Sequence, residues 1–90
     1  MALDLLTTTA FEKDVRRVLK KGKNLDKMED IVDSLLAQEP LPAHCRPHPL
    51  RGDWAGHWDC HVEPDWLLLY RLTSKALVLV RTGSHAERSG

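Results

Sequence analysis

The sequence predicts an α+β fold, a small two-layer domain in which an antiparallel sheet carries an α-helical hairpin on one face. Two early segments have helical periodicity, and three later segments have strand character and short connectors. The chain has 90 residues, which suits one domain, residues 1–90, rather than two. The expected element order is β-α-α-β-β-β.

The first strand and the first helix are expected within residues 2–22. Residues 2–6 form a short apolar segment, and Thr9-Ala-Phe-Glu12 has the pattern of a capping box, in which Thr9 and Glu12 each satisfy a free N–H. Gly22 is expected to end the helix, because glycine adopts the left-handed conformation without steric cost. The apolar face of this helix is predicted to consist of Phe11, Val15, Val18 and Leu19.

A second helix is expected to follow directly. Asn24 is a good N-cap, and Pro40 and Pro42 mark the end of the segment. The two helices are predicted to form an antiparallel hairpin, because the link between them is very short. The buried stripe of the second helix is predicted to be Leu25, Met28, Ile31, Val32, Leu35 and Leu36.

Residues 41–56 are rich in Pro, Gly, His and Arg, which predicts an irregular loop. Three strands are expected after it, at about 57–62, 66–72 and 76–82. The connectors 63–65 and 73–75 are short enough for hairpins. These segments form the expected antiparallel meander.

Composition excludes several classes of protein. The 13 Lys and Arg balance the 13 Asp and Glu, so no uniformly basic surface is present. The longest apolar runs have five residues, whereas a membrane-spanning helix needs about 20. The start of the chain does not have the features of a signal peptide. We therefore expect a cytoplasmic protein with no membrane partner and with Cys45 and Cys60 reduced, although a disulfide between them is a second possibility.

Basic residues are concentrated near the tip of the predicted helical hairpin. An ordinary solvated helix surface is the default interpretation. A phosphate-contacting patch is the functional one. The residues of this cluster are Arg16, Arg17, Lys20, Lys21, Lys23 and Lys27.

All five histidines lie in the second half of the chain, at His44, His48, His57, His61 and His85. Alternation along 57–62 places His57, Asp59 and His61 on one face. A sheet with one solvent-exposed face would by itself explain why these three residues are polar. Histidine can also give and take protons near neutral pH. Two imidazoles near a phosphodiester could remove the proton of a ribose 2′-OH and protonate the leaving 5′-oxygen. Arg81 is a candidate for stabilising the phosphate charge, or for an ion pair with Asp59 or Glu63.

A metal site is the rival chemistry. His44 and His48, like His57 and His61, are spaced by four residues, and the two cysteines are further candidate ligands. In a strand this spacing corresponds to about 13 Å, too far for one ion, so no metal site is assigned. Of the tryptophans, Trp66 follows a turn and is expected to keep part of its ring accessible for stacking on a base, whereas Trp58 is expected to pack.

Four segments together resemble one protein family. They are HPLRGDWAG from His48, DCHVEPDW ending at Trp66, YRLT from Tyr70 and RTGSH ending at His85. This combination is similar to the YafQ family, a branch of the RelE/ParE superfamily of toxins from type II toxin–antitoxin systems. The resemblance spans essentially the whole chain, including the start of the first helix, where Phe11, Lys13 and Asp14 follow Thr8.

The resemblance implies an endoribonuclease that cuts mRNA in the ribosomal A site, through attack by the ribose 2′-OH and without a metal or other cofactor. It implies that His85 is the leading general acid/base, with His48 and His61 as partners and Asp65 orienting an imidazole or holding substrate. Trp66, Arg81, Arg16, Lys20 and Lys21 are assigned to substrate binding. The implied partners are the ribosome, mRNA and a RelB-like or DinJ-like antitoxin, with operator DNA bound only through the antitoxin complex.

The tail departs from the family pattern. Arg88 and Ser89 stand where family members carry Leu and Phe. An alternative function follows from this departure, because the superfamily also contains members that do not cut RNA. In this alternative, the chain is a non-catalytic ParE/RelE-like binding module that complexes an antitoxin.

Overall fold

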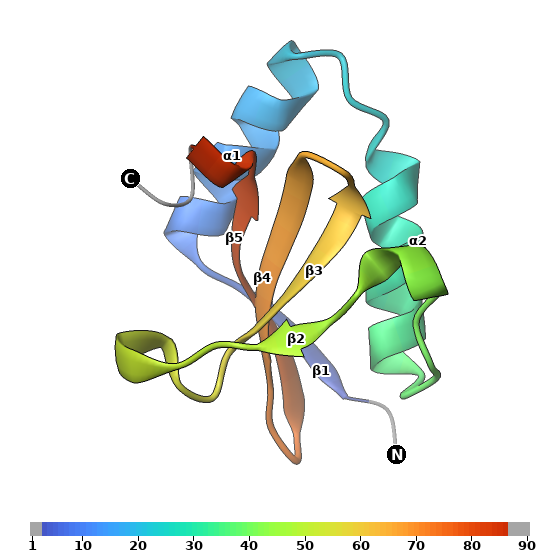
Figure 1. Cartoon of the computed structure of the whole chain (residues 1–90), viewed down its shortest axis with the longest axis vertical. Helices are drawn as coiled ribbons and strands as arrows, with labels where there is room; N and C mark the ends of the chain where they lie inside the picture. Colours follow the sequence, from blue (N-terminus) through green and yellow to red (C-terminus); the bar gives the residue numbers. More distant parts are fainter. Residues whose placement is uncertain (1–2, 87–90) are drawn as a thin grey trace.

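The computed structural model describes residues 3–86. Its sheet has the strand order β1-β5-β4-β3-β2, formed by β1 (Asp4–Thr7), β2 (His48–Pro49), β3 (Trp58–Glu63), β4 (Trp66–Leu72) and β5 (Ala76–Gly83). β1 runs parallel to β5, and all other neighbours are antiparallel. Two helices, α1 (Thr9–Lys20) and α2 (Leu25–Leu36), complete the predicted α+β fold (Figure 1).

The N-terminus of α1 differs from the prediction. Thr8, not Thr9, is the N-cap, and its hydroxyl oxygen accepts a hydrogen bond from the N–H of Phe11 at 3.0 Å. The same hydroxyl donates to the carbonyl oxygen of Val80 at 2.7 Å. The predicted capping box is therefore wrong, because this contact with β5 holds Thr8 in the extended conformation that a cap requires.

Two other helix signals act as predicted. Gly22 follows α1 with a φ of +79°, which is the left-handed conformation of a helix C-terminus. Asn24 caps α2 by accepting from the N–H of Asp26 at 2.9 Å. Leu19 is 52% exposed and does not belong to the buried face of α1, whereas Asp14 is almost fully buried there.

The loop predicted at 41–56 contains ordered elements. Two short 3₁₀ helices, η1 (Ala43–Cys45) and η2 (Gly52–Trp54), flank β2. β2 adds a fifth strand to the sheet by pairing His48 with Asp59 and Pro49 with Trp58. A strand of two residues that includes a proline has too weak a pattern to be recognised without its partner strand.

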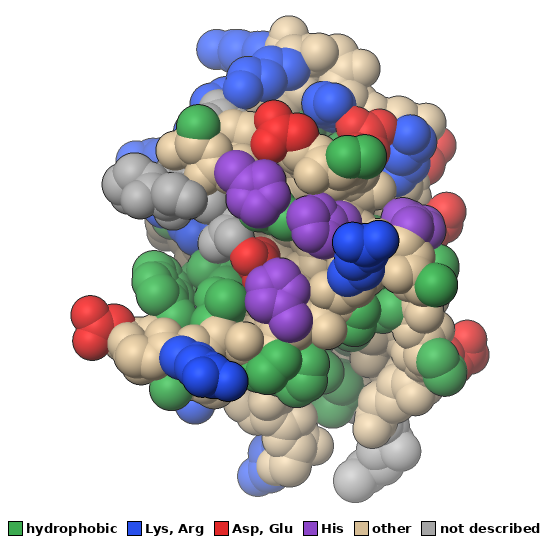
Figure 2. All heavy atoms as spheres, viewed as in Figure 1, with side chains coloured by type: hydrophobic (Ala, Val, Ile, Leu, Met, Phe, Trp, Pro, Cys, Tyr) green, Lys and Arg blue, Asp and Glu red, His purple; other side chains and the backbone are tan. Residues whose placement is uncertain are grey.

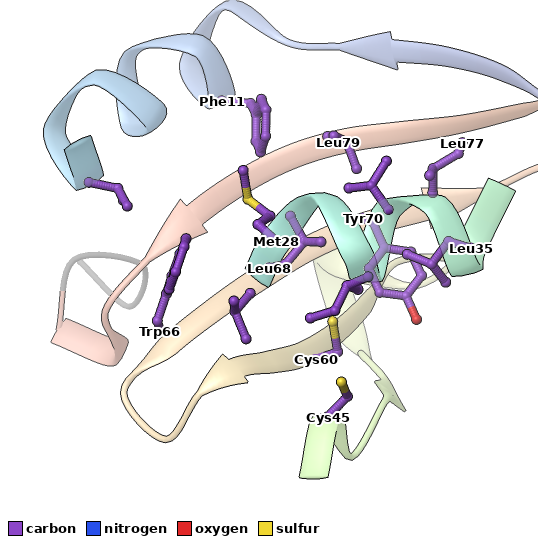
Figure 3. Packing of buried hydrophobic residues seen from close by; sticks show 14 residues of the cluster. Phe11, Met28, Leu35, Cys45, Cys60, Trp66, Leu68, Tyr70, Leu77 and Leu79 are labelled. Atoms are coloured by element: carbon purple, nitrogen blue, oxygen red, sulfur yellow. The ribbon is translucent and has the colours of Figure 1, made fainter. Parts of the chain in front are cut away.

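The helices cover one face of the sheet and enclose the core. α1 packs chiefly against β5 and α2 against β3, as Figure 1 shows. The core includes the helix-facing residues of β4, which are Trp66, Leu68 and Tyr70. Figure 3 shows Cys45 and Cys60 close together in this cluster; both are free thiols and fully buried.

The face of the sheet away from the helices is less exposed to solvent than the alternation of side chains along 57–62 predicts. On β3, Asp59 and His61 do face away from Cys60 and Val62, but Asp59 is only 4% exposed. Leu67 and Leu69, opposite His61 and Asp59 on β4, are also buried. In Figure 1 the segment that carries β2 and η2 crosses in front of the strands on this face.

Within residues 3–86, neither helix has the length and apolar character needed to cross a bilayer.

Candidate active site

Sheet register brings several of the predicted site residues to the face that the helices leave uncovered. Residues directly opposite each other on neighbouring strands point to the same face. One row across β2, β3, β4 and β5 consists of His48, Asp59, Leu69 and Arg81, and the next row contains His61, Leu67 and Gly83. Figure 2 shows histidine side chains gathered on this face.

His61 and His85 form the closest histidine pair that the structure records. Their ring centroids are 5.8 Å apart, and the ring planes are tilted by 53°. His61 is partly buried, and its Nδ1 atom has no hydrogen-bond partner among the described residues. His85 is exposed just beyond the end of β5. The pair therefore offers one imidazole held in the sheet and one accessible to a ligand.

Asp65 contacts the backbone of His85 rather than its ring. The N–H of His85 donates to Asp65 Oδ1 at 3.3 Å, which ties the β3–β4 turn to the end of β5. Asp65 thus contributes to placing His85. This geometry differs from the expected contact with an imidazole.

Trp66 supports this region from the core. Its ring is only 1% exposed, so the prediction that part of it stays accessible is wrong. Its indole N–H donates to Thr82 Oγ1 at 2.8 Å, and the Thr82 hydroxyl donates to the Leu67 carbonyl oxygen at 2.7 Å. The accessible tryptophans are instead Trp54 and Trp58, which are 47% and 37% exposed. The turn before Trp66 exposes Asp65 and not the ring, because the ring faces the helices.

The other histidines occupy different surroundings. His48 is exposed on β2, and its Nδ1 lies 3.2 Å from the Arg46 carbonyl oxygen. His44 and His61 both line a hollow at the edge of β3, together with Arg46, Glu63 and Pro64. His57 does not belong to a strand. It contacts Trp54 in the loop, with ring centroids 5.3 Å apart in a T-shaped arrangement.

Arg81 pairs with neither of the carboxylates considered from the sequence. Its Nε and Nη2 atoms donate to Asp14 at 2.6 and 3.2 Å. Glu63 instead binds Lys23 and Lys27, each at 2.7 Å. These two lysines hold the pKa of Glu63 below its usual value.

Asp14 is the site residue that the sequence prediction missed. It follows Phe11 by three residues and precedes Val18 by four, so helical periodicity alone places this carboxylate on the apolar face of α1. Burial by itself would raise the pKa of Asp14, but hydrogen bonds from Arg81, the Thr82 N–H and Arg17 outweigh it and lower this pKa. The carboxylate is therefore ionised beside its two arginines at neutral pH.

The basic residues near the tip differ in their surroundings. Arg17 binds Asp14, and Lys23 and Lys27 bind Glu63. The other three, Arg16, Lys20 and Lys21, are exposed. Lys21 also lines a small hollow with Asp65 and with Gly83 and Ser84 at the end of β5. The end of the basic tip that carries Lys21 therefore lies next to residues that adjoin His85.

Across residues 3–86, no three His, Cys, Asp or Glu side chains are grouped in a way that could hold a metal ion. The altered tail at Arg88 and Ser89 lies outside the described residues.

Comparison with known proteins identifies the family. Residues 3–89 match the family described as bacterial toxin of type II toxin-antitoxin system, YafQ. The mRNA interferase toxin YafQ of Escherichia coli strain K12 is 42% identical over 88 residues, which cover 97% of this chain and 96% of that protein.

Solved structures agree with this match. The chain is similar to one in the E. coli DinJ–YafQ toxin–antitoxin complex, with a TM-score of 0.92, 41% identity and full coverage of both chains. It is also similar to a metal-bound toxin from Helicobacter pylori, with a TM-score of 0.89, 36% identity and coverage of 94% and 97%. The predicted resemblance is thereby confirmed, and the chain belongs to the YafQ family of toxins from type II toxin–antitoxin systems.

Proposed function

We propose that this protein is a ribosome-dependent mRNA endoribonuclease that inhibits translation as the toxin of a type II toxin–antitoxin system. The observation that carries the proposal is the placement of His61 and His85 with ring centroids 5.8 Å apart, on the same face of the sheet as His48 and Arg81. A 42% identical relative is named as an mRNA interferase toxin, which supports the same activity.

The reaction is an internal displacement at phosphorus. A general base removes the proton of the ribose 2′-OH, the 2′-oxygen attacks the adjacent phosphorus, and the bond from phosphorus to the 5′-oxygen breaks. A general acid protonates that leaving oxygen, so the products carry a 2′,3′-cyclic phosphate and a 5′-OH. Each positioned proton transfer contributes a rate factor of about 10²–10⁴.

The histidines divide these roles. His85 is exposed and is the leading acid/base, while His61 and His48 transfer protons or bind the phosphate. Asp65 is assigned to placing His85, because it accepts from the His85 N–H. Trp66 supports the site from the core through Thr82 and does not stack on the substrate.

Cationic side chains contact phosphates in this proposal. Arg81 lies in the same register row as His48 and stabilises the charge that grows on the phosphate oxygens. Arg16, Lys20 and Lys21 contact RNA phosphates away from the reacting bond, since these three are exposed and Lys21 borders the hollow next to Asp65.

The partners follow from the family and the activity. The ribosome and the mRNA in its A site are the targets, so the protein acts in the cytoplasm. A DinJ-like antitoxin neutralises it, as supported by the match to the DinJ–YafQ complex. Operator DNA is bound only through the complex of toxin and antitoxin.

Cleavage of mRNA on programmed ribosomes, with analysis of the ends, tests the proposal. We expect wild-type protein and His57→Ala to cleave, because the His57 ring packs against Trp54 in the loop and is not part of the histidine pair. His85→Ala is expected to leave the message intact. Intact message with the wild type, or full activity of His85→Ala, contradicts the proposal.

Two further measurements separate the alternatives. A non-catalytic binding module is tolerated when the chain is expressed without its antitoxin, whereas an active toxin stops growth. Addition of EDTA to the cleavage assay tests a role for metal, which the metal-bound relative makes worth measuring. Cleavage that survives chelation agrees with the proposed chemistry of histidine and arginine.

A further inference from the structure

Asp14 and Arg81 come from opposite ends of the chain and meet where β5 forms the edge of the sheet. β1 pairs with β5 only from Ala76 to Leu79, so the end of β5 has no neighbouring strand on that side. α1 fills this place, and Asp14 accepts from the Thr82 N–H at 3.1 Å. The carboxylate thus accepts the hydrogen bond of a backbone N–H that would otherwise pair with a further strand.

The same carboxylate holds Arg81 in a fixed orientation. Its two oxygens accept from Nε and Nη2 of Arg81 at 2.6 and 3.2 Å, and Oδ1 also accepts from Arg17 at 2.5 Å. The Asp14 side chain is 2% exposed, whereas that of Arg81 is 36% exposed. A side-on pair of this kind fixes the plane of the guanidinium group.

The pair leaves Arg81 able to bind an anion. A guanidinium group has five N–H donors, and the carboxylate engages only its Nε and Nη2 edge. The single negative charge of Asp14 is shared between two arginines, Arg81 and Arg17. The remaining donors lie on a partly exposed group in the register row that also contains His48.

We propose that Asp14 is a positioning residue that holds the guanidinium group of Arg81 in place to bind the phosphate undergoing cleavage. This inference rests on the proposed endoribonuclease function. Asp14 itself contacts no RNA and acts through Arg81. The depressed pKa of Asp14 and the raised pKa of Arg81 keep both groups ionised at neutral pH.

A double-mutant cycle on programmed ribosomes tests the inference. Asp14→Asn keeps the size of the side chain and removes its charge, and it is made with Arg81 intact and in the Arg81→Ala background. With Arg81 intact, we expect the cleavage rate at saturating ribosome concentration to fall about 10- to 100-fold, because a misplaced catalytic group costs up to roughly that factor. In the Arg81→Ala background, Asp14→Asn is expected to cause no further loss.

A matched control separates positioning from general damage to α1. Glu12→Gln makes the same change from carboxylate to amide on the same helix, where the exposed Glu12 carboxylate accepts from the Thr7 hydroxyl at 2.9 Å. This variant is expected to keep the wild-type rate. Ribosome affinity is measured for every variant, and we expect Asp14→Asn to lower the rate and leave this affinity unchanged.

Arg81→Lys tests the same contact by changing the arginine, and it leaves the buried Asp14 carboxylate in place. Lysine keeps the charge and loses the side-on pair, so its rate is expected to fall close to that of Arg81→Ala. This variant gives a result even where Asp14→Asn does not fold. Full activity of Arg81→Lys, or an equal loss from Asp14→Asn with and without Arg81, overturns the inference.

The result with wild-type protein distinguishes a failure of the proposed function from a failure of the role proposed for Asp14. Intact message with wild-type protein contradicts the endoribonuclease function and the role of Asp14 together. Cleavage by the wild type, combined with independent effects at Asp14 and Arg81, contradicts only the role of Asp14.

Discussion

The imidazole rings of His61 and His85 lie with their centroids 5.8 Å apart, although His61 is on β3 and His85 lies just beyond the end of β5. In the proposed function, these two imidazoles act on one phosphodiester. One of them removes a proton and the other delivers one, which is the pair of steps that acid/base cleavage requires.

The first prediction concerns the coupling of this pair. His85→Ala and His61→Ala are each expected to lower the single-turnover rate by about 10²–10⁴, and the double variant by less than the product of the two losses. Residues that serve the same transition state give such non-additive effects. Rates on programmed ribosomes check this, and strictly multiplicative losses contradict a shared step.

The second prediction concerns the exposed part of the basic tip. The double charge reversal Lys20→Glu and Lys21→Glu is expected to weaken binding to ribosomes by on the order of tenfold at low salt and to reduce the salt dependence. Affinity for the antitoxin is expected to stay the same. Lys75→Glu, a single charge reversal in the turn before β5 that makes half this change in net charge, is the control for net charge. Loss of antitoxin binding with unchanged ribosome binding assigns the tip to the antitoxin instead.

The third prediction concerns the buried hydrogen bond beneath the site. Trp66→Phe removes the indole N–H that donates to Thr82, and the loss is expected to lower the free energy of unfolding by about 1–3 kcal/mol. Trp58→Phe makes the same replacement of an indole by a phenyl ring at a residue that is 37% exposed, and it is expected to change the free energy of unfolding by less. Urea unfolding measures both, and equal stabilities of the two variants argue against a structural role for the bond.

The fourth prediction concerns stability in acid. The pKa of Asp14 is lower in the folded protein than its usual value, so the ionised carboxylate contributes stability above the pKa of the unfolded chain. This contribution is lost as the pH falls below about 4. Asp14→Ala is expected to cost about 2–3 kcal/mol at pH 7, toward the low end for a broken buried ion pair because both arginines are partly exposed. At pH 2 the difference from wild type is expected to shrink, and a constant difference contradicts the assignment.

The fifth prediction concerns the two thiols. Burial, reinforced by Cys45 and Asp59 nearby, raises the pKa of Cys60 to about 12, and burial also raises that of Cys45. Neither thiol is therefore expected to react with an alkylating reagent at pH 8 in the folded protein, whereas both react in denaturant. Mass spectrometry counts the labels. Rapid labelling of the native protein contradicts this burial.

Local sequence signals predicted the elements whose pattern is complete within one segment. β4 occupies the predicted residues Trp66–Leu72, and Asn24 and Gly22 act as the expected helix signals. Thr8 was missed as a cap because its deciding contact is with Val80, a distant residue. β2 was missed for the same reason, since its two residues become a strand only through pairing with β3.

For the site as well, local sequence signals identified candidate residues, whereas contacts between distant segments could not be predicted. The sequence pointed to His61, His85 and Arg81 as candidates, but not to the carboxylate that binds Arg81. The position of Asp14 on an apolar helix face was a usable signal, although only the fold shows that its partner is Arg81. The exposures of Trp66 and Trp58 were assigned the wrong way round, because both depend on how far the helices reach over the sheet.

The pairing of β1 with β5 also ties the beginning of the fold to its last strand. β1 needs β5 as its partner strand, and Asp14 needs Arg81, so neither contact forms before β5 has been synthesised. Contacts between such distant segments slow folding, because the intervening chain must be closed into a loop first. We therefore expect partial chains that stop before β5 to lack both the complete sheet and the Asp14–Arg81 ion pair.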